Sequence, residues 1–206
     1  DRGINASSGM LILNPNARST FRCGMSNQSF AYGSVRYVGA EIRAVILSKM
    51  QIDVQKNICV ISGESIAVEA ANLAAEGTVI AVEYNKHDRK TLEDNVSQFG
   101  LNNVSIVDHV DEETFQNLPV PDVTMLVASA SMEQEMACLL KLNPNMEFVI
   151  YTLDFGVAAS MSELCKKMGI IDVEIIQIAV SHLNQKHNFE TQPAPWIISG
   201  KANGEG

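Results

Sequence analysis

Short apolar runs alternate along this chain with amphipathic segments of helical length. The pattern predicts strands at 58–62, 78–83, 104–108, 122–128 and 147–152, and helices at 64–75, 86–99, 131–141 and 157–168. Apolar strands separated by helices are typical of a parallel sheet covered on both faces. From Val38 onward, Ile42, Val45, Ile46 and Met50 recur at helical spacing, which predicts another helix, lying against an edge of the sheet.

The last forty residues follow a different pattern. Residues 172–181 and 194–199 are two predicted strands with no helix between them, so we expect them to pair as an antiparallel hairpin. A mostly parallel, Rossmann-like α/β sheet that ends in such a hairpin is the class I S-adenosylmethionine-dependent methyltransferase arrangement. A nicotinamide-dependent oxidoreductase would instead continue with further strand-helix units and would carry a dinucleotide fingerprint. The topology favours methyl transfer over hydride transfer.

Composition bounds the organisation of the chain. With 206 residues, 46% hydrophobic and 19% charged, it fits one globular domain, which we place at 34–206 behind a Ser-, Asn- and Gly-rich N-terminal tail or linker at 1–33. The net charge of −9 disfavours binding to nucleic acid or to an anionic membrane. Four cysteines without a CxxC pair, and no apolar run long enough to span a bilayer, favour a cytoplasmic location.

The turn after the first strand is the strongest local signal for a nucleotide-type cofactor. A buried strand passes through Gly63 directly into an alanine-rich helix, and the second strand ends in Glu83, about 20 residues further on, the spacing at which an acid reaches a ribose hydroxyl. Glu83 is either this ribose ligand or a solvated acid that ends a strand. Gly63 either presents a backbone N–H or only permits a tight turn. Glu64 is expected to complement the dipole of the following helix.

Five segments carry a more specific signal. They are Cys23–Phe30, Glu41–Lys49, Ser65–Ala71, Gly77–Glu83 and Tyr151–Asp154. Together, and in this order, they resemble the decarboxylating precorrin methyltransferases of cobalamin biosynthesis, over roughly residues 24 to 200. In that family the domain resembles a carboxyl-terminal half that is often fused behind another corrinoid methyltransferase.

The resemblance implies a function and a site. The function would be S-adenosylmethionine-dependent methylation of ring carbons of a precorrin, a tetrapyrrole, with loss of carbon dioxide from an acetate side chain, by a possible homo-oligomer. The cofactor would lie at the turns after the strands, which contain Ser62, Gly63, Glu83, Tyr84, His109 and Ala128. Methyl transfer depends on alignment more than on a protein nucleophile, so no catalytic residue is assigned.

The cofactor-facing turns depart from the family pattern. Val60–Glu64 replaces a glycine-rich loop, is shorter by about two residues and keeps only one glycine, while His109 and Ala128 stand in turns where the family has Gly-Asp-Ala and Gly-Gly. The alternative function is therefore a degenerate methyltransferase-fold protein that has lost the cofactor and acts as a scaffold or partner.

Basic side chains are further candidates, as ligands for a polycarboxylate substrate. The alternative for each of them is an ordinary solvated surface. His182 and His187 do not have the spacing of a zinc site, and no metal is expected. The candidate substrate contacts are Arg36, Arg43, Lys49, His182, Lys186 and His187.

Overall fold

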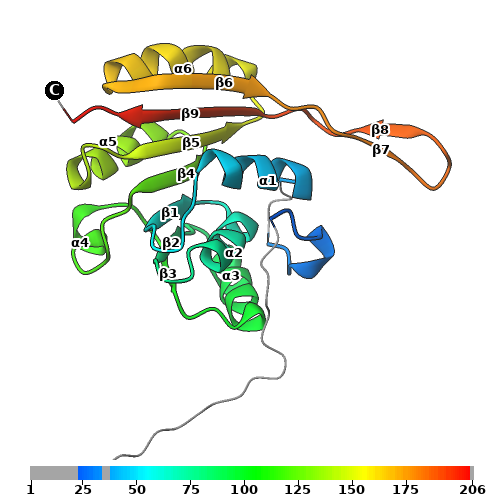
Figure 1. The fold of residues 1–206 in the computed structure, drawn as a ribbon, viewed down its shortest axis with the longest axis horizontal. Helices are drawn as coiled ribbons and strands as arrows, with labels where there is room; N and C mark the ends of the chain where they lie inside the picture. The colour runs from blue at the N-terminus through cyan, green and yellow to red at the C-terminus, as the bar shows by residue number, and fades with distance from the viewer. Residues whose placement is uncertain (1–22, 34–37, 205–206) are drawn as a thin grey trace, which may run out of the picture.

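The computed structural model describes residues 23–33 and 38–204. Within these residues the chain forms a seven-stranded sheet in the order β3-β2-β1-β4-β5-β9-β6 (Figure 1). The first five strands are parallel, and β9 runs antiparallel between β5 and β6. Their bounds are β1 Ile58–Ile61, β2 Val79–Val82, β3 Val104–Val107, β4 Val123–Val127, β5 Glu147–Thr152, β6 Ile170–Gln177 and β9 Trp196–Ala202.

Helices cover both faces of the sheet, and each face has its own apolar cluster. Alternate strand residues serve the two clusters: Ile58 and Val60 of β1 face one, Cys59 and Ile61 the other. The first cluster contains side chains of α1 Ala40–Lys49, α2 Glu64–Leu73 and α3 Lys86–Phe99. The second contains those of α4 Glu112–Phe115, α5 Met132–Leu142 and α6 Phe155–Lys167.

The predicted class I methyltransferase fold is confirmed, including the antiparallel pairing of the last two long strands. Two details differ. The predicted final hairpin contains an additional exposed ribbon, β7 Ser181–Leu183 paired with β8 Phe189–Thr191, which projects beyond the sheet (Figure 1). The first helix lies on a face of the sheet rather than at an edge, because Ile42 and Ile46 pack into the same cluster as α2.

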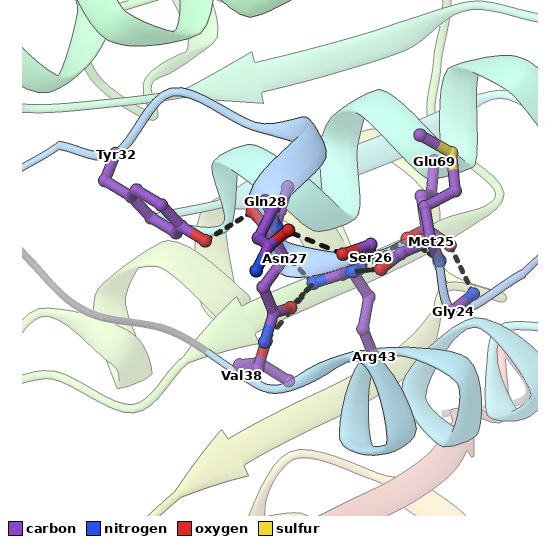
Figure 2. Close-up of polar contacts among 10 residues, drawn as sticks. Gly24, Met25, Ser26, Asn27, Gln28, Tyr32, Val38, Arg43 and Glu69 are labelled. Carbon is purple, nitrogen blue, oxygen red and sulfur yellow. Dashed lines mark hydrogen bonds and ion pairs between the residues drawn. The ribbon is translucent and has the colours of Figure 1, made fainter.

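Residues 23–33, which we call the strap, are held against the domain by a buried ion pair (Figure 2). Arg43 of α1 donates from Nε to Oε1 of Glu69 on α2 over 2.5 Å, and both side chains are 1% exposed. The Glu69 carboxylate also accepts the backbone N–H groups of Gly24, at 2.7 Å, and Met25, at 2.9 Å. The guanidinium donates to the carbonyl oxygen of Met25 as well. The strap backbone thus supplies both other donors to the carboxylate and one acceptor to the guanidinium. The guanidinium also donates to the Asn27 side chain, the Val38 carbonyl oxygen and the Ser65 hydroxyl.

Further contacts extend this attachment to α3. Asn95, fully buried on α3, accepts the N–H of Ala31 at 2.8 Å and donates to its carbonyl oxygen at 3.0 Å. Phe30 lies under the Arg43 guanidinium, 4.7 Å from the ring centroid, and packs against Phe99. The described end of the predicted 1–33 tail or linker is thus packed against α1, α2 and α3. Residues 1–22 lie outside the described part.

The turn between β1 and α2 uses its residues differently from what a glycine motif would suggest. Ser62, not Gly63, has the left-handed conformation, with φ of 57°. Gly63 has φ of −144°, and a Cβ atom there would lie 2.9 Å from Cγ1 of Val60 and 3.3 Å from the sulfur of Met125. Glycine is therefore needed at 63 because the backbone packs directly on β1 and β4, not because of a positive φ.

Of the helices in the described ranges, none has both the length and the apolar character that crossing a membrane requires.

Removing one partner of the buried ion pair should destabilise the protein strongly. Arg43→Met or Glu69→Gln leaves a buried charge or its donors without compensation, and the free energy of unfolding in urea should fall by about 3–5 kcal/mol. Lys167→Ala, which breaks an exposed pair with Glu133, is the control and should change it little. A loss at Arg43 no larger than that of the control would contradict the assigned role.

Removing the glycine at 63 and adding one at 62 should have opposite effects on the free energy of unfolding. Gly63→Ala should lower the free energy of unfolding by about 1–3 kcal/mol, because its Cβ overpacks the contact with Val60. Ser62→Gly should be neutral or stabilising by up to about 1 kcal/mol, since it relieves a left-handed conformation. Urea unfolding of both variants tests this, and the reverse ranking would show that the turn is wrongly described.

Candidate functional site

A cavity of about 440 Å³ opens at the carboxyl ends of β1, β2, β4 and β5. Its walls come from the residues that follow each of these strands. Parallel strands end at one edge of the sheet, so the topology alone brings these four turns together. The volume lies within the range of about 300–1,000 Å³ that is usual for sites of cofactors and other small ligands.

Five of the six residues predicted to contact a cofactor line this cavity: Ser62, Gly63, Glu83, Tyr84 and Ala128. His109 does not. It follows β3, the edge strand furthest from β4 on that side, and its half-exposed imidazole lies 2.5 Å from Asp108 and 2.9 Å from Asp111. The sheet order therefore explains why the turn after β3 is separated from the other turns.

Glu83 is the central polar group of the cavity. It is 6% exposed, and its pKa is raised to about 8, first by burial and then by the negative charges of Glu64 and Asp88. The backbone of Gly63 hydrogen-bonds to the carboxylate, and the Arg89 charge also acts to lower the pKa. The Gly63 N–H is thus occupied by a hydrogen bond to Glu83. The group that this turn offers to the cavity is therefore the Glu83 carboxylate and not the Gly63 amide.

The lining is acidic. Glu64, in the first turn of α2, and Asp88, in the first turn of α3, are both buried beside Glu83, and Asp154 caps α6 at the opposite wall. Among the described residues that line the cavity, none is a lysine or an arginine. The apolar part of the wall includes Ile66 and Leu153.

Asp88, Thr152 and Asp154 also line the cavity, although they were not predicted as site residues from the sequence. The two aspartates could have been predicted from the sequence. Asp88 lies in the first turn of α3 and Asp154 is the N-cap of α6, and each of these helices follows a strand. Residues at such positions share the ligand-binding edge of the sheet with the strand ends.

The expected substrate contacts are not brought to this cavity. Arg43 was a candidate substrate contact with a solvated surface as its alternative. Both readings are wrong, because the side chain is buried and its guanidinium donates to Glu69 and to the strap. Lys49 pairs with Glu174, and His182 lies 3.9 Å from Glu41. Lys186 and His187 lie in the turn of the exposed ribbon formed by β7 and β8. Arg36 lies outside the described residues.

No cluster of three or more His, Cys, Asp or Glu side chains suited to a metal ion occurs in the described ranges.

Comparison with solved structures identifies close matches in fold. A precorrin-6y C5,15-methyltransferase from Geobacter metallireducens superposes with a TM-score of 0.79 at 23% identity, covering 87% of this chain and 97% of that one. The precorrin-8w decarboxylase of Methanobacterium thermoautotrophicum gives 0.71 at 17% identity, covering 84% and 97%. The C-terminal domain of a precorrin-6Y C5,15-methyltransferase from Rhodobacter capsulatus gives 0.71 at 18%, covering 88% and 99%.

A search of curated proteins found no match. The family comparison is decisive instead, because the model of the precorrin methyltransferase domain matches residues 36–195, more than half of the chain and the whole of the region that builds the cavity. The chain therefore belongs to the precorrin methyltransferase family, the S-adenosylmethionine-dependent methyltransferases of cobalamin biosynthesis.

Proposed function

We propose that this protein binds S-adenosylmethionine in the cavity above β1, β2, β4 and β5 and methylates ring carbons of a precorrin, with decarboxylation of an acetate side chain. The observation that carries the proposal is the position of Glu83. Its carboxylate ends β2 at the wall of a cavity large enough for the cofactor, and it offers acceptors for the two hydroxyls of a ribose.

The residues present fit an adenosyl group. Tyr84 follows Glu83 and adds an aromatic wall beside the ribose position, while Ile66 and Val127 supply apolar surface. The Gly63 backbone holds the Glu83 carboxylate in place. Ser62 has the left-handed backbone that the turn needs without a glycine, so the loss of glycines has not closed the cavity.

The chemistry of the site would rest on alignment. The bound cofactor supplies an electrophilic methyl group on a sulfonium centre. This chain's residues would hold it by the ribose, exclude water and orient a substrate carbon, which is where most of the rate enhancement of such transfers arises. The names of the similar solved proteins, a C5,15-methyltransferase and a decarboxylase, are the reason for proposing both carbon methylation and decarboxylation here.

A second candidate function is a methyltransferase-fold scaffold that no longer uses the cofactor. One observation favours it: the buried Glu64 carboxylate lies in the first turn of α2, at the helix end where the cofactor's own carboxylate would be expected to bind. Two negative groups at this position would repel one another. If the protein is a scaffold, we therefore expect it to bind S-adenosylmethionine weakly or not at all.

Calorimetric titration with S-adenosylmethionine separates the two functions. The methyltransferase proposal predicts saturable binding by the wild-type protein, and Glu83→Ala should weaken it by at least about tenfold because hydrogen bonds to a charged acceptor are lost. Glu93→Ala, on the exposed face of α3, is the matched control and should bind as wild type. Absence of binding by folded wild-type protein at millimolar cofactor would leave the scaffold as the function.

The affinity should also depend on pH through Glu83. With a pKa of about 8, the carboxyl is mostly protonated at pH 7 and mostly ionised at pH 9. If the ionised form is the ribose acceptor, the affinity should rise with pH, by up to about tenfold between these values. The Glu83→Gln side chain cannot titrate, so any pH dependence of the affinity that remains in this variant comes from the cofactor's own ionisable groups. Parallel pH profiles for wild type and Glu83→Gln would exclude the role of the carboxylate.

A further inference from the structure

The dipeptide Glu83–Tyr84 is held by long side chains from helices on both faces of the sheet. From α3, Nη1 of Arg89 donates to the carbonyl oxygens of Glu83, at 2.8 Å, and of Tyr84, at 3.0 Å. From α5, on the opposite face, the Glu135 carboxylate accepts the Tyr84 hydroxyl. The backbone and the ring of this segment are thus fixed from two directions by groups of the protein itself.

Glu135 makes few other contacts for a buried charged group. It is 4% exposed, whereas Tyr84 is 45% exposed. The same carboxylate oxygen that accepts from Tyr84 accepts the hydroxyl of Ser131 at 2.7 Å. Its other oxygen, Oε2, is buried and accepts no hydrogen bond in the described part of the chain. Burying a carboxylate with two hydroxyl donors is a costly way to stabilise a fold, so its contact with a half-exposed ring needs another explanation.

The ring of Tyr84 lines the cavity beside Glu83, where the adenine of an adenosyl ligand would follow the ribose. A hydrogen bond from the hydroxyl to a buried carboxylate fixes both the rotamer and the tilt of the ring. A side chain ordered in advance does not have to be ordered on binding, which increases the affinity for a flat aromatic ligand.

We propose that Glu135 is a positioning residue that acts through Tyr84: it holds the tyrosine ring as a preformed wall for the adenine of the cofactor. Ser131 completes the arrangement by orienting the shared carboxylate oxygen. The proposal rests on the proposed binding of S-adenosylmethionine and adds a residue to it that touches neither the cavity nor the ligand.

A double-mutant cycle on the affinity for S-adenosylhomocysteine tests the proposal. Glu135→Ala and Tyr84→Phe should each weaken binding by about five- to tenfold, and the double variant should bind no more weakly than the weaker single variant. Glu135→Gln keeps an acceptor for the hydroxyl and should stay within about twofold of wild type. Glu133→Ala, an exposed glutamate on the same helix, is the matched control and should have no effect.

Thermal unfolding of the same variants distinguishes positioning from support of the fold. Glu135→Ala should keep or raise the melting temperature while it weakens binding, because it removes an incompletely satisfied buried carboxylate. The proposal is overturned if Glu135→Ala leaves the affinity unchanged, or if it weakens binding equally with and without the Tyr84 hydroxyl. Failure of the wild-type protein to bind any adenosyl compound overturns the proposed function, and this inference with it.

Discussion

The buried ion pair between Arg43 and Glu69 is the interaction on which the rest of the structure depends. It joins α1 to α2 and holds the strap against the domain, because strap backbone donates to the carboxylate and accepts from the guanidinium. A buried pair of this kind stabilises a fold only when its remaining donors and acceptors are also used. Here the strap, Val38 and Ser65 use them. The helix that it anchors, α2, begins at the cavity, so the same contact determines where Glu64 and Ser65 lie.

The cavity is built on the parallel strands expected for the fold, but the turns that line it differ in sequence from the family pattern. The framework is set by four parallel strand ends, which cluster whatever residues follow them. The altered turn after β1 keeps its path by two local means: Ser62 takes the left-handed conformation, and Gly63 removes the side chain that would collide with Val60. A loop with a single glycine therefore still leaves a cavity at the strand ends. Burial, and then the charges of Glu64 and Asp88, raise the pKa of Glu83 in its wall.

Much of the fold was predictable because it depends on patterns within short segments. β1 and β2, which are buried on both faces, are apolar throughout. α3 begins after a capping asparagine, Asn85, and is followed by Gly100 in the left-handed conformation. The ribbon formed by β7 and β8 was missed because its strands are three residues long and exposed, with no apolar alternation to mark them. α4, with four residues, is nearly as short and was missed as well.

The site was predictable where it follows from topology and not where it depends on long-range partners. Strand ends and spacing singled out Glu83 and the turn at Gly63, and the family resemblance added Tyr84; all three line the cavity. Arg43 was misassigned because nothing near it in sequence shows that Glu69, 26 residues away, would bury its charge. Glu135 was missed for the same reason, since its partner Tyr84 lies 51 residues away.

A crystal structure of the protein with S-adenosylhomocysteine, grown above pH 8 so that Glu83 is ionised, would test the role of Glu83 most directly. We expect the nucleoside in the cavity, with both ribose hydroxyls about 2.6–3.0 Å from the Glu83 carboxylate oxygens. A nucleoside bound elsewhere, or an empty cavity at saturating ligand with Glu64 filling the position of the cofactor, would contradict this role.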